Sequence, residues 1–536
     1  MRFKFLAYIL ILFLISCGGG GSKSTSSTPA VPVSSEEAAR FLHQATFGPN
    51  MNEIEKVAKK GYALWIDEQL KSGATYMYPK MRVVTEQEYS SHVKQWWKTI
   101  LKSNDQLRQR VAFALSEIFV VSDAENFSDQ QLALASYYDI LIRYSFGNFR
   151  TLMTEVTLNP IMGEYLSLKG NQKPVPEENI RPDENYAREI MQLFTIGLVE
   201  LNLDGTPVLD AEGKTIPTYN QDTIKAFAHI YTGWNWSNCK DFYDYPEEPN
   251  YRDSMKAFED FHDLSSQVLL NGEVMPANLN AADGLKFALD NIFNHPNVGP
   301  FISKQLIKKL VTSNPSPEYV KRVATVFNDN GLGVRGDLGA VVKAILLDTE
   351  ARSGQLEKPE TYGKLKEPII RLANLWRAFN ASAKTGEFDY TYPQAELQQC
   401  PLRAPTVFNF FTPDYSQTGN ISEKGLISPE FQIHDETSIV NITNKLYGST
   451  YWYIKGNDNV EDYYIVIDID KEKSLASDPD ALLDRLNLLL LSGTMSSELR
   501  SAVKEMIEFH DVENTTQRVT EAIFLIMSSP EGSVQK

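Results

Sequence analysis

Apolar residues recur at spacings of three and four along most of this chain, and this periodicity is typical of amphipathic helices. Between residues 106 and 121, for example, Leu107, Val111, Leu115 and Ile118 form one stripe. The helical segments follow one another at irregular intervals, which does not fit a solenoid repeat. We therefore expect a mainly α fold, an irregular multi-helix bundle with small β-hairpin insertions.

Two segments depart from the helical pattern. Residues 198–217 contain Asp-Gly and Glu-Gly turns between short β-prone runs, which predicts a hairpin insert. Residues 451–470 alternate and are rich in Tyr, Ile and Val, which suggests a second hairpin. We expect a main helical domain over residues 36–425 and a C-terminal helical extension over residues 426–536.

The N-terminus has the pattern of an export signal. A basic start at Arg2 and Lys4 precedes an apolar run that is too short to span a bilayer permanently. Cys17 follows small residues, so residues 1–16 are predicted to be a lipoprotein signal peptide and Cys17 the lipidated residue. Residues 17–35 have the Gly/Ser/Thr composition of a flexible tether. The alternative is an ordinary secretory signal in which Cys17 is incidental.

The net charge of the chain limits the classes of partner that it can bind electrostatically. The 536 residues carry a formal net charge of −17, which argues against nucleic-acid binding and against electrostatic adhesion to anionic lipid. Membrane attachment would therefore depend on the lipid anchor. We expect a protein of the bacterial cell envelope, lipid-anchored and located at the outer membrane.

The richest group of polar residues lies between residues 181 and 236. Glu184 and Arg188 stand four apart and fit a surface pair on one helix. Glu184 and Glu189 are about 140° apart around a helix, so they do not converge as a two-carboxylate site from that helix alone. Glu184, Arg188 and Glu189 are candidate catalytic residues, and the alternative is an Arg/Glu network that ties helices together.

Histidines supply the other candidates. His229 lies beside an apolar helical stripe, which fits either a boundary histidine or a catalytic one. His262 and Asp263 are adjacent in a loop after an acidic, aromatic run, and they would supply one metal ligand and one supporting acid. We therefore include His229, His262 and Asp263 as candidate catalytic residues, and His262 and Asp263 as candidate ligands of a divalent metal.

The sequence gives less support for other kinds of functional site. The sequence has no HExxH, GxSxG, glycine-rich phosphate loop or paired CxxC. Cys239 and Cys400 leave one disulfide open. The acids of the 198–217 insert suit turns better than a calcium loop. Aromatic residues near Trp96, Trp234 and Phe410 would line a sugar groove, or they hold loops against the core.

Long ordered motifs resemble the bacterial family called domain of unknown function 1800. The likeness runs from about Glu36 to the C-terminal SSPE. The motifs include RFLHQATFGP, NPIMGEYLSL, RPDENYAREIMQLFTIG, AFAHIYTGW, FEDFHD, NHPNVGPFISKQLIKKL, GVRGDLGAVVKAILLDTEAR and PLRAPTVFNFFTPDY.

The resemblance implies an exported, mostly helical protein of unestablished activity, often partnered with an exported sulfatase-like protein encoded nearby. This chain has Gln267 where relatives tend to carry a Lys.

Two functions remain open from these observations. The first is a binding or accessory factor for an exported partner. The second is a metal- or carboxylate-dependent hydrolase of an envelope or polymer substrate, centred on the six candidate residues. An enzyme should bring those side chains together in a concave pocket, whereas an accessory factor should pair them locally and expose an apolar patch elsewhere.

Overall fold

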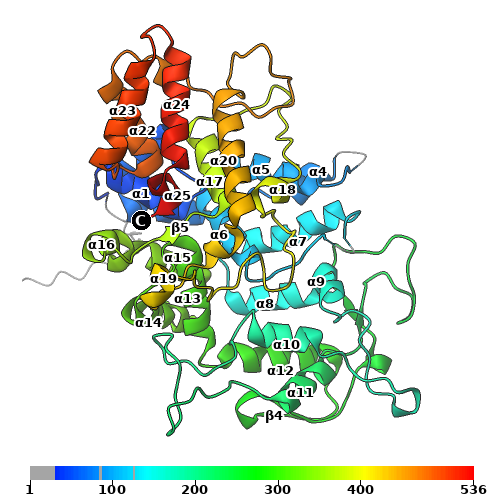
Figure 1. The fold of residues 1–536 in the computed structure, drawn as a ribbon. Helices are drawn as coiled ribbons and strands as arrows, with labels where there is room; N and C mark the ends of the chain where they lie inside the picture. Colours follow the sequence, from blue (N-terminus) through cyan, green and yellow to red (C-terminus); the bar gives the residue numbers. More distant parts are fainter. Residues whose placement is uncertain (1–29, 84–86, 125–126) are drawn as a thin grey trace, which may run out of the picture.

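Helices make up most of the computed structural model, which describes residues 30–83, 87–124 and 127–536 (Figure 1). Strands are limited to three two-stranded antiparallel sheets within the described residues. The predicted fold class, mainly α with small β elements, is therefore confirmed. The signal peptide, Cys17 and most of the tether lie outside the described residues.

The N-terminal part of the fold is a run of packed helices. Side chains of Ser34, Asn50, Asn148 and Asn159 cap helix starts by accepting backbone N–H groups, as short polar residues do at this position. The helices are α1 (Ser35–Ala45), α2 (Met51–Lys60), α3 (Tyr62–Lys71), α4 (Tyr78–Met81), α5 (Ser91–Lys102), α6 (Gln106–Ser116), α7 (Gln131–Tyr144), α8 (Phe149–Leu158) and α9 (Pro160–Tyr165).

The middle of the chain contains helices separated by long polar loops, in which the short strands lie. Its helices are α10 (Asn185–Gln192), α11 (Gln221–Ile230), α12 (Ala281–Asn294), α13 (Val298–Leu310), α14 (Pro317–Asn328), α15 (Leu338–Leu347) and α16 (Thr349–Glu357). The strands are β1 (Trp234–Asn235), β2 (Lys256–Ala257), β3 (Gln267–Val268) and β4 (Val274–Met275), and the 3-10 turns are η1 (Pro176–Glu178), η2 (Glu259–Phe261) and η3 (Leu270–Gly272).

The C-terminal part returns to the N-terminal helices. Its elements are β5 (Lys364–Leu365), α17 (Pro368–Ala378), α18 (Pro393–Leu397), α19 (Asn420–Glu423), η4 (Pro429–Ile433), α20 (Glu436–Tyr451), α21 (Asp470–Lys473), α22 (Pro479–Leu491), α23 (Ser497–Phe509), α24 (Thr515–Ser528), α25 (Pro530–Ser533) and β6 (Val534–Gln535). β6 pairs with β5.

One hydrophobic core runs through both predicted domains. It includes Phe41 of α1, Leu372 of α17 and Leu486 of α22, all essentially inaccessible to solvent. α22 packs against α1 and against α17. Residues 426–536 therefore share the core of the main helical domain, while α10, α11 and α12 lie at the opposite end of the molecule from α22, α23 and α24 (Figure 1).

The two predicted hairpins have different outcomes. The 198–217 insert forms nested antiparallel bridges, with Val199 opposite Pro217 and Leu209 opposite Thr215, so a hairpin is present. The 451–470 segment departs from the prediction: α20 occupies its first residue, Ile454 makes a parallel bridge with Ile467, and Val466 pairs with Ser382 instead. The alternating pattern correctly predicted a half-buried extended segment. Its pairing partner, however, is Ser382, which lies outside the segment.

A cluster of charged side chains lies inside the core. Lys364 Nζ is 3.0 Å from Glu430 and 3.5 Å from Glu367, and Lys309 Nζ is 3.4 Å from Glu117. Burial and the neighbouring Glu367 raise the pKa of Glu117. We call this the buried charge cluster; it comprises Arg110, Glu117, Lys309, Lys364, Glu367 and Glu430.

No helix among the described residues combines the length and apolar character needed to cross a membrane.

Candidate functional site

His229 and Asp263 form a hydrogen-bonded dyad. His229 Nδ1 donates to Asp263 Oδ2 at 2.6 Å, from the last turn of α11 to the loop after η2. Burial raises the pKa of Asp263, but hydrogen bonds from His229 and Ser265 outweigh it and bring that pKa to about 2. The carboxylate therefore stays ionised and fixes the orientation of the imidazole through Nδ1, so that Nε2 lies on the other side of the ring. The His229 side chain is 28% exposed, so solvent reaches the ring.

The turn after α11 holds this dyad in place. The Thr232 hydroxyl donates to the His229 carbonyl and accepts the Asp263 backbone N–H at 2.9 Å. Gly233 follows with a φ of +87°, and its backbone bonds to Phe258 and Asn171. A Cβ on Gly233 would lie 3.0 Å from both the His262 nitrogen and the Phe258 carbonyl oxygen. Only glycine therefore lets the two loops approach closely enough to form the dyad.

His262 points away from the dyad and into the core. Its side chain is fully buried, and Nδ1 donates to the Thr232 carbonyl at 3.0 Å. Its Nε2 side faces α12, where a Cβ added at Gly284 would lie 3.5 Å from Nε2. This imidazole wedges α11 against α12. The adjacent residues His262 and Asp263 thus send their side chains to different surroundings.

Glu184 and Arg188 form the predicted pair at the start of α10. Arg188 donates to Glu184 Oε2 at 3.2 Å, and Gln221 of α11 donates to the same oxygen at 2.6 Å. Both members of the Glu184–Arg188 pair are about one third exposed. Because Gln221 is the first residue of α11, the bond to Glu184 joins α10 to α11. This arrangement fits the alternative of a polar network that ties helices together.

Glu189 is only partly satisfied, as is His262, whose Nε2 is buried without a hydrogen-bond partner. Glu189 is 6% exposed, one of its carboxylate oxygens is buried without a hydrogen-bond partner, and burial raises its pKa. The Tyr219 hydroxyl is likewise buried without a partner, and burial together with the nearby Glu189 raises the Tyr219 pKa to about 12. Burial thus disfavours the ionised form of both groups.

The six candidates therefore fall into separate local sets. Printed contacts join His229 to Asp263 and Glu184 to Arg188, while His262 and Glu189 are held individually. In residues 30–83, 87–124 and 127–536, no group of three or more His, Cys, Asp or Glu side chains is arranged to hold a metal ion. The proposed divalent metal at His262 and Asp263 stays a prediction without a third ligand.

The family of the chain follows from a match along nearly its whole length. The model of the family described as "Protein of unknown function (DUF1800)" matches residues 40–533. The chain belongs to this family. No curated protein and no solved structure matches the chain. The resemblance drawn from the motifs is confirmed, and the family itself carries no assigned activity.

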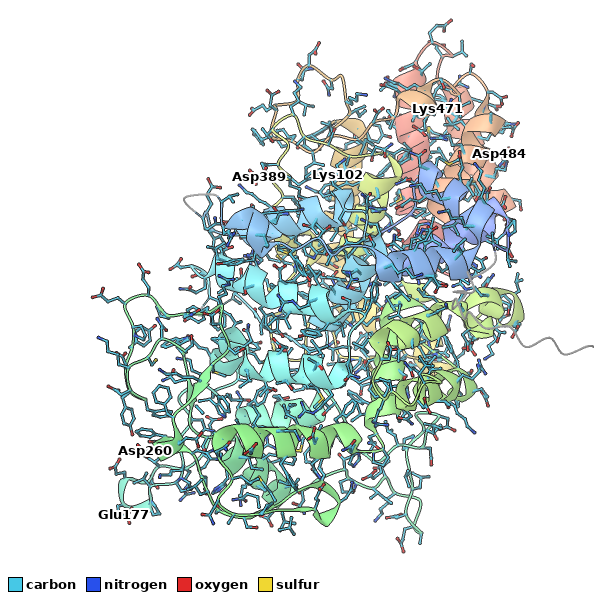
Figure 2. All side chains as sticks on the ribbon, turned by 180° about the vertical axis from the view of Figure 1, so that it is seen from behind. Lys102, Glu177, Asp260, Asp389, Lys471 and Asp484 are labelled. Carbon is cyan, nitrogen blue, oxygen red and sulfur yellow. The ribbon has the colours of Figure 1, made fainter. Side chains whose placement is uncertain are left out.

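Family motifs are present both at the dyad and in the core. The AFAHIYTGW and FEDFHD stretches meet through the His229–Asp263 bond. FEDFHD also supplies Asp260, an exposed residue at the outer edge of the molecule (Figure 2). The KQLIKKL stretch sends Lys309 into the buried charge cluster, where its ammonium lies 4.3 Å from the Phe411 ring of PLRAPTVFNFF. Both the dyad and the buried charge cluster thus lie within the matched residues 40–533.

Trp96, Trp97, Trp234 and Trp236 are buried, as expected if these aromatic residues hold loops against the core. In the hairpin insert, Asp204 and Asp210 accept N–H groups of their own turns, as turn chemistry requires. Cys239 and Cys400 are free, buried thiols rather than a disulfide.

One group of polar residues was missed by the sequence reasoning. Lys94, Lys98 and Lys102 stand four apart, so they share one face of α5, and Lys98 and Lys102 line a cavity with Lys80 of α4. The four-residue spacing was the available signal. Lysines on one helix face usually mark a solvated surface, so this spacing alone does not indicate a site.

Proposed function

We propose that the chain is an exported, lipid-anchored binding or accessory factor that acts through an exported partner protein. The observation that carries the proposal is that the six candidate side chains are divided among local contacts within the helix packing. Two of the six keep a buried atom without a hydrogen-bond partner, Glu189 at one carboxylate oxygen and His262 at Nε2. A hydrolytic centre would instead bring them around one concave site.

An exposed apolar surface beside the dyad supports partner binding. Val268 and Val274 face each other across the β3–β4 pair and are 58% and 57% exposed. Leu264, next to Asp263, is also exposed. Contiguous exposed apolar residues at a hairpin are typical of protein contact sites. We assign this hairpin surface, Leu264 with Val268 and Val274, to the exported partner, for which a sulfatase-like protein encoded nearby is the expectation.

Site-specific crosslinking tests the partner. A photo-crosslinking amino acid at position 268 in the producing bacterium should yield one crosslinked product that contains the exported sulfatase-like protein. The same group at position 471, on α21, should not give that product. Equal crosslinking from both positions, or none from position 268, would remove the hairpin surface as the contact site. Metabolic acyl labelling that is lost in Cys17→Ala tests the anchor.

The dyad favours a second function, a hydrolase that uses water. Asp263 orients the imidazole, and His229 Nε2 would remove a proton from a water molecule that attacks the substrate. No Ser, Thr or Cys hydroxyl or thiol bonds to that nitrogen in the described part of the chain, so water is the nucleophile that fits. Turnover of an ester, phosphoester or glycoside panel that disappears in a stably folded His229→Gln variant would favour this function over the first.

A further inference from the structure

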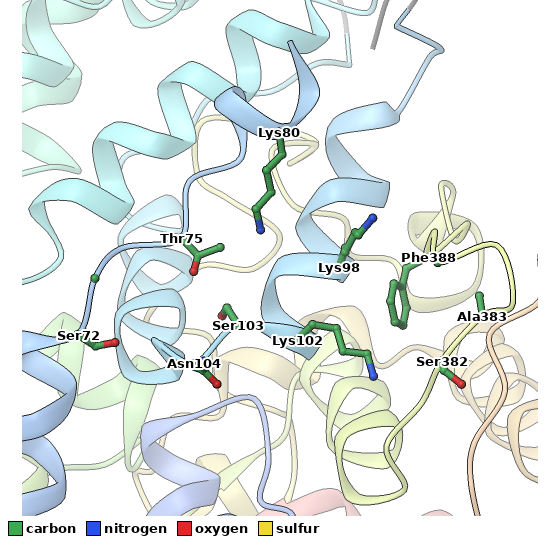
Figure 3. A pocket seen from close by; sticks show the side chains of 12 residues that line it. Ser72, Thr75, Lys80, Lys98, Lys102, Ser103, Asn104, Ser382, Ala383 and Phe388 are labelled. Carbon is green, nitrogen blue, oxygen red and sulfur yellow. The ribbon is translucent and has the colours of Figure 1, made fainter. Parts of the chain in front are cut away.

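A cavity between α4, α5 and the loop that follows α17 is lined by lysines. It has a volume of about 680 Å³, and its walls come from the segment between α3 and α4, from α5, and from the loop that follows α17. Such a volume lies within the range of small-molecule sites. Lys80 reaches in from α4, Lys98 and Lys102 come from α5, and Ser382, Ala383 and Phe388 close the other side (Figure 3).

The charge of the lining is one-sided. Three of the lining residues are lysines and none is an aspartate or glutamate. This contrasts with the whole chain, whose formal net charge is −17. The positive lining is thus a local feature and does not reflect a generally basic protein. An anion inside the cavity would meet attraction at short range, while the remainder of the chain would repel it at long range.

The lysines of α5 differ in how they are neutralised. Lys94 lies 2.9 Å from Glu88 and 3.3 Å from Asp389, and Lys98 lies 2.7 Å from Glu387. Lys102, the third lysine on this face, has no carboxylate within ion-pair distance among the described residues; its ammonium lies 5.6 Å from the Phe388 ring. Lys94 and Lys98 are therefore compensated by carboxylates, whereas Lys102 is not, although Lys98 and Lys102 both line the cavity.

Lys80 is the second uncompensated ammonium. It makes no ion pair in the part of the chain that the structure describes. Burial lowers its pKa, and the nearby Lys98 lowers it further, while Asp105 and Asp139 act in the opposite direction. Burial also lowers the pKa of Lys102, with a further contribution from Arg377. A bound anion would relieve the repulsion that these ammonium groups feel.

The other lining groups can bond to oxygen. Ser72, Thr75, Ser103 and Ser382 offer hydroxyls, and Asn104 offers an amide. Phosphate, sulfate and carboxylate oxygens accept bonds from ammonium and hydroxyl donors alike. The Phe388 ring provides one apolar wall. The lining thus combines two free charges with neutral donors.

We propose that this cavity binds a small ligand that carries at least two negative charges, a phosphate ester or a polycarboxylate, through Lys80 and Lys102. Lys98 is paired with Glu387, and it can bind a ligand that displaces Glu387 from this ion pair. The site is separate from the His229–Asp263 dyad and from the hairpin surface, and it does not depend on the function proposed above.

Calorimetric titration of the purified chain with inorganic pyrophosphate and, separately, with citrate tests the site at low ionic strength. Binding of pyrophosphate alone assigns a phosphate ester, binding of citrate alone assigns a polycarboxylate, and binding of both supports a general polyanion site. No binding of either overturns the proposal. Added salt should weaken the binding, because the contacts are solvent-reachable.

Variants connect the binding to the cavity. The double variant Lys80→Gln/Lys102→Gln should raise the Kd about tenfold, since each exposed charge contact contributes a factor of about three to five. Glu387→Gln should lower the Kd, because it frees Lys98. Lys471→Gln, an exposed lysine outside the cavity, should leave the Kd unchanged. Equal Kd values in the double variant and the parent, with both folded by circular dichroism, would place the anion elsewhere and overturn the proposal.

Discussion

Lys364 Nζ lies 3.0 Å from Glu430 Oε1, and both side chains are 2% exposed. The same ammonium donates to the carbonyl groups of Lys308 and Lys309, so one lysine joins β5, α13 and η4. Because a buried ion pair is costly to desolvate, it adds little net stability when intact. Breaking it is a different matter, since the remaining carboxylates would be left buried without their cation.

Lys364→Met should therefore lower the free energy of unfolding by about 3–5 kcal/mol, the usual cost of an uncompensated buried charge. Urea unfolding followed by tryptophan fluorescence measures it. The matched control is Lys424→Met, because Lys424 pairs with Glu360 at the surface at 3.5 Å. That variant should change stability by about 0–1 kcal/mol. Similar losses in the two variants would contradict a special role for the buried pair.

Lys366 should make stability depend on pH in the alkaline range. Burial lowers its pKa to about 7, and Arg371 adds to the effect. Between about pH 7 and pH 10.5 the unfolded chain holds a proton that the folded chain has released, so the free energy of unfolding rises with pH in this window. Lys366→Met should reduce this slope and stabilise the protein near pH 7 by about 1–2 kcal/mol.

Urea midpoints measured at pH 7, 8, 9 and 10 would decide this prediction. Some slope should persist in the variant, because burial also lowers the pKa of Lys308 to about 7. His43 faces Lys366, and burial, together with the charge of Lys366, lowers the His43 pKa, so His43 contributes mainly below this window. An unchanged slope in Lys366→Met would show that Lys366 is charged in the folded state.

Asp263 should make the free energy of unfolding depend on pH in the acidic range. Its folded pKa of about 2 lies below the ordinary value of 3.8, so its contribution is present above about pH 4 and is lost as the pH falls toward 2. Asp263→Asn should therefore be less stable than the parent at pH 5, by about 1 kcal/mol, and closer to it at pH 2.5. Urea unfolding at these two pH values measures the difference. A constant difference at both values would mean that the dyad does not depend on the ionised carboxylate.

Gly233→Ala should loosen the dyad without touching either member. The residue has a left-handed φ of +87°, and the added Cβ would press on the His262 backbone and the Phe258 carbonyl. We expect a loss of about 1–3 kcal/mol. The control is Gly213→Ala, at a similar φ of +78° but with no atom within 4 Å of the added Cβ. Thermal unfolding should separate the two, and equal losses would assign the whole cost to φ.

The helices were predictable because their signals are local. Apolar spacing identified the segments, and residues such as Asn50 and Asn220 now cap helices that begin where short polar side chains precede an apolar stripe. Burial in the interior of the helix bundle was harder to predict. Arg110 lies off the apolar stripe of α6, a position typical of a surface residue, yet it is 1% exposed. A helix that is packed on all sides buries its polar face too, and periodicity cannot reveal that.

The candidate site was only partly accessible to sequence reasoning for a similar reason. Glu184 and Arg188 are four residues apart, so their pairing follows from helix geometry. His229 and Asp263 are 34 residues apart, and their bond depends on how two loops meet at Gly233. Adjacency favoured His262 with Asp263, but consecutive side chains in an extended loop point in different directions. The free lysines of the cavity come from α4 and α5, and their proximity is a property of the packing alone.

The pairing of β5 with β6 affects when the fold can be completed. Gln535 donates its side-chain amide to the carbonyl groups of Leu310 and Val311, across sequence separations of 225 and 224 residues. Contacts of such separation form late, because a long loop must first close. During synthesis the end of α13 thus stays unfinished until the far end of the chain arrives. The chain can therefore close its fold completely only after its last residues have been made.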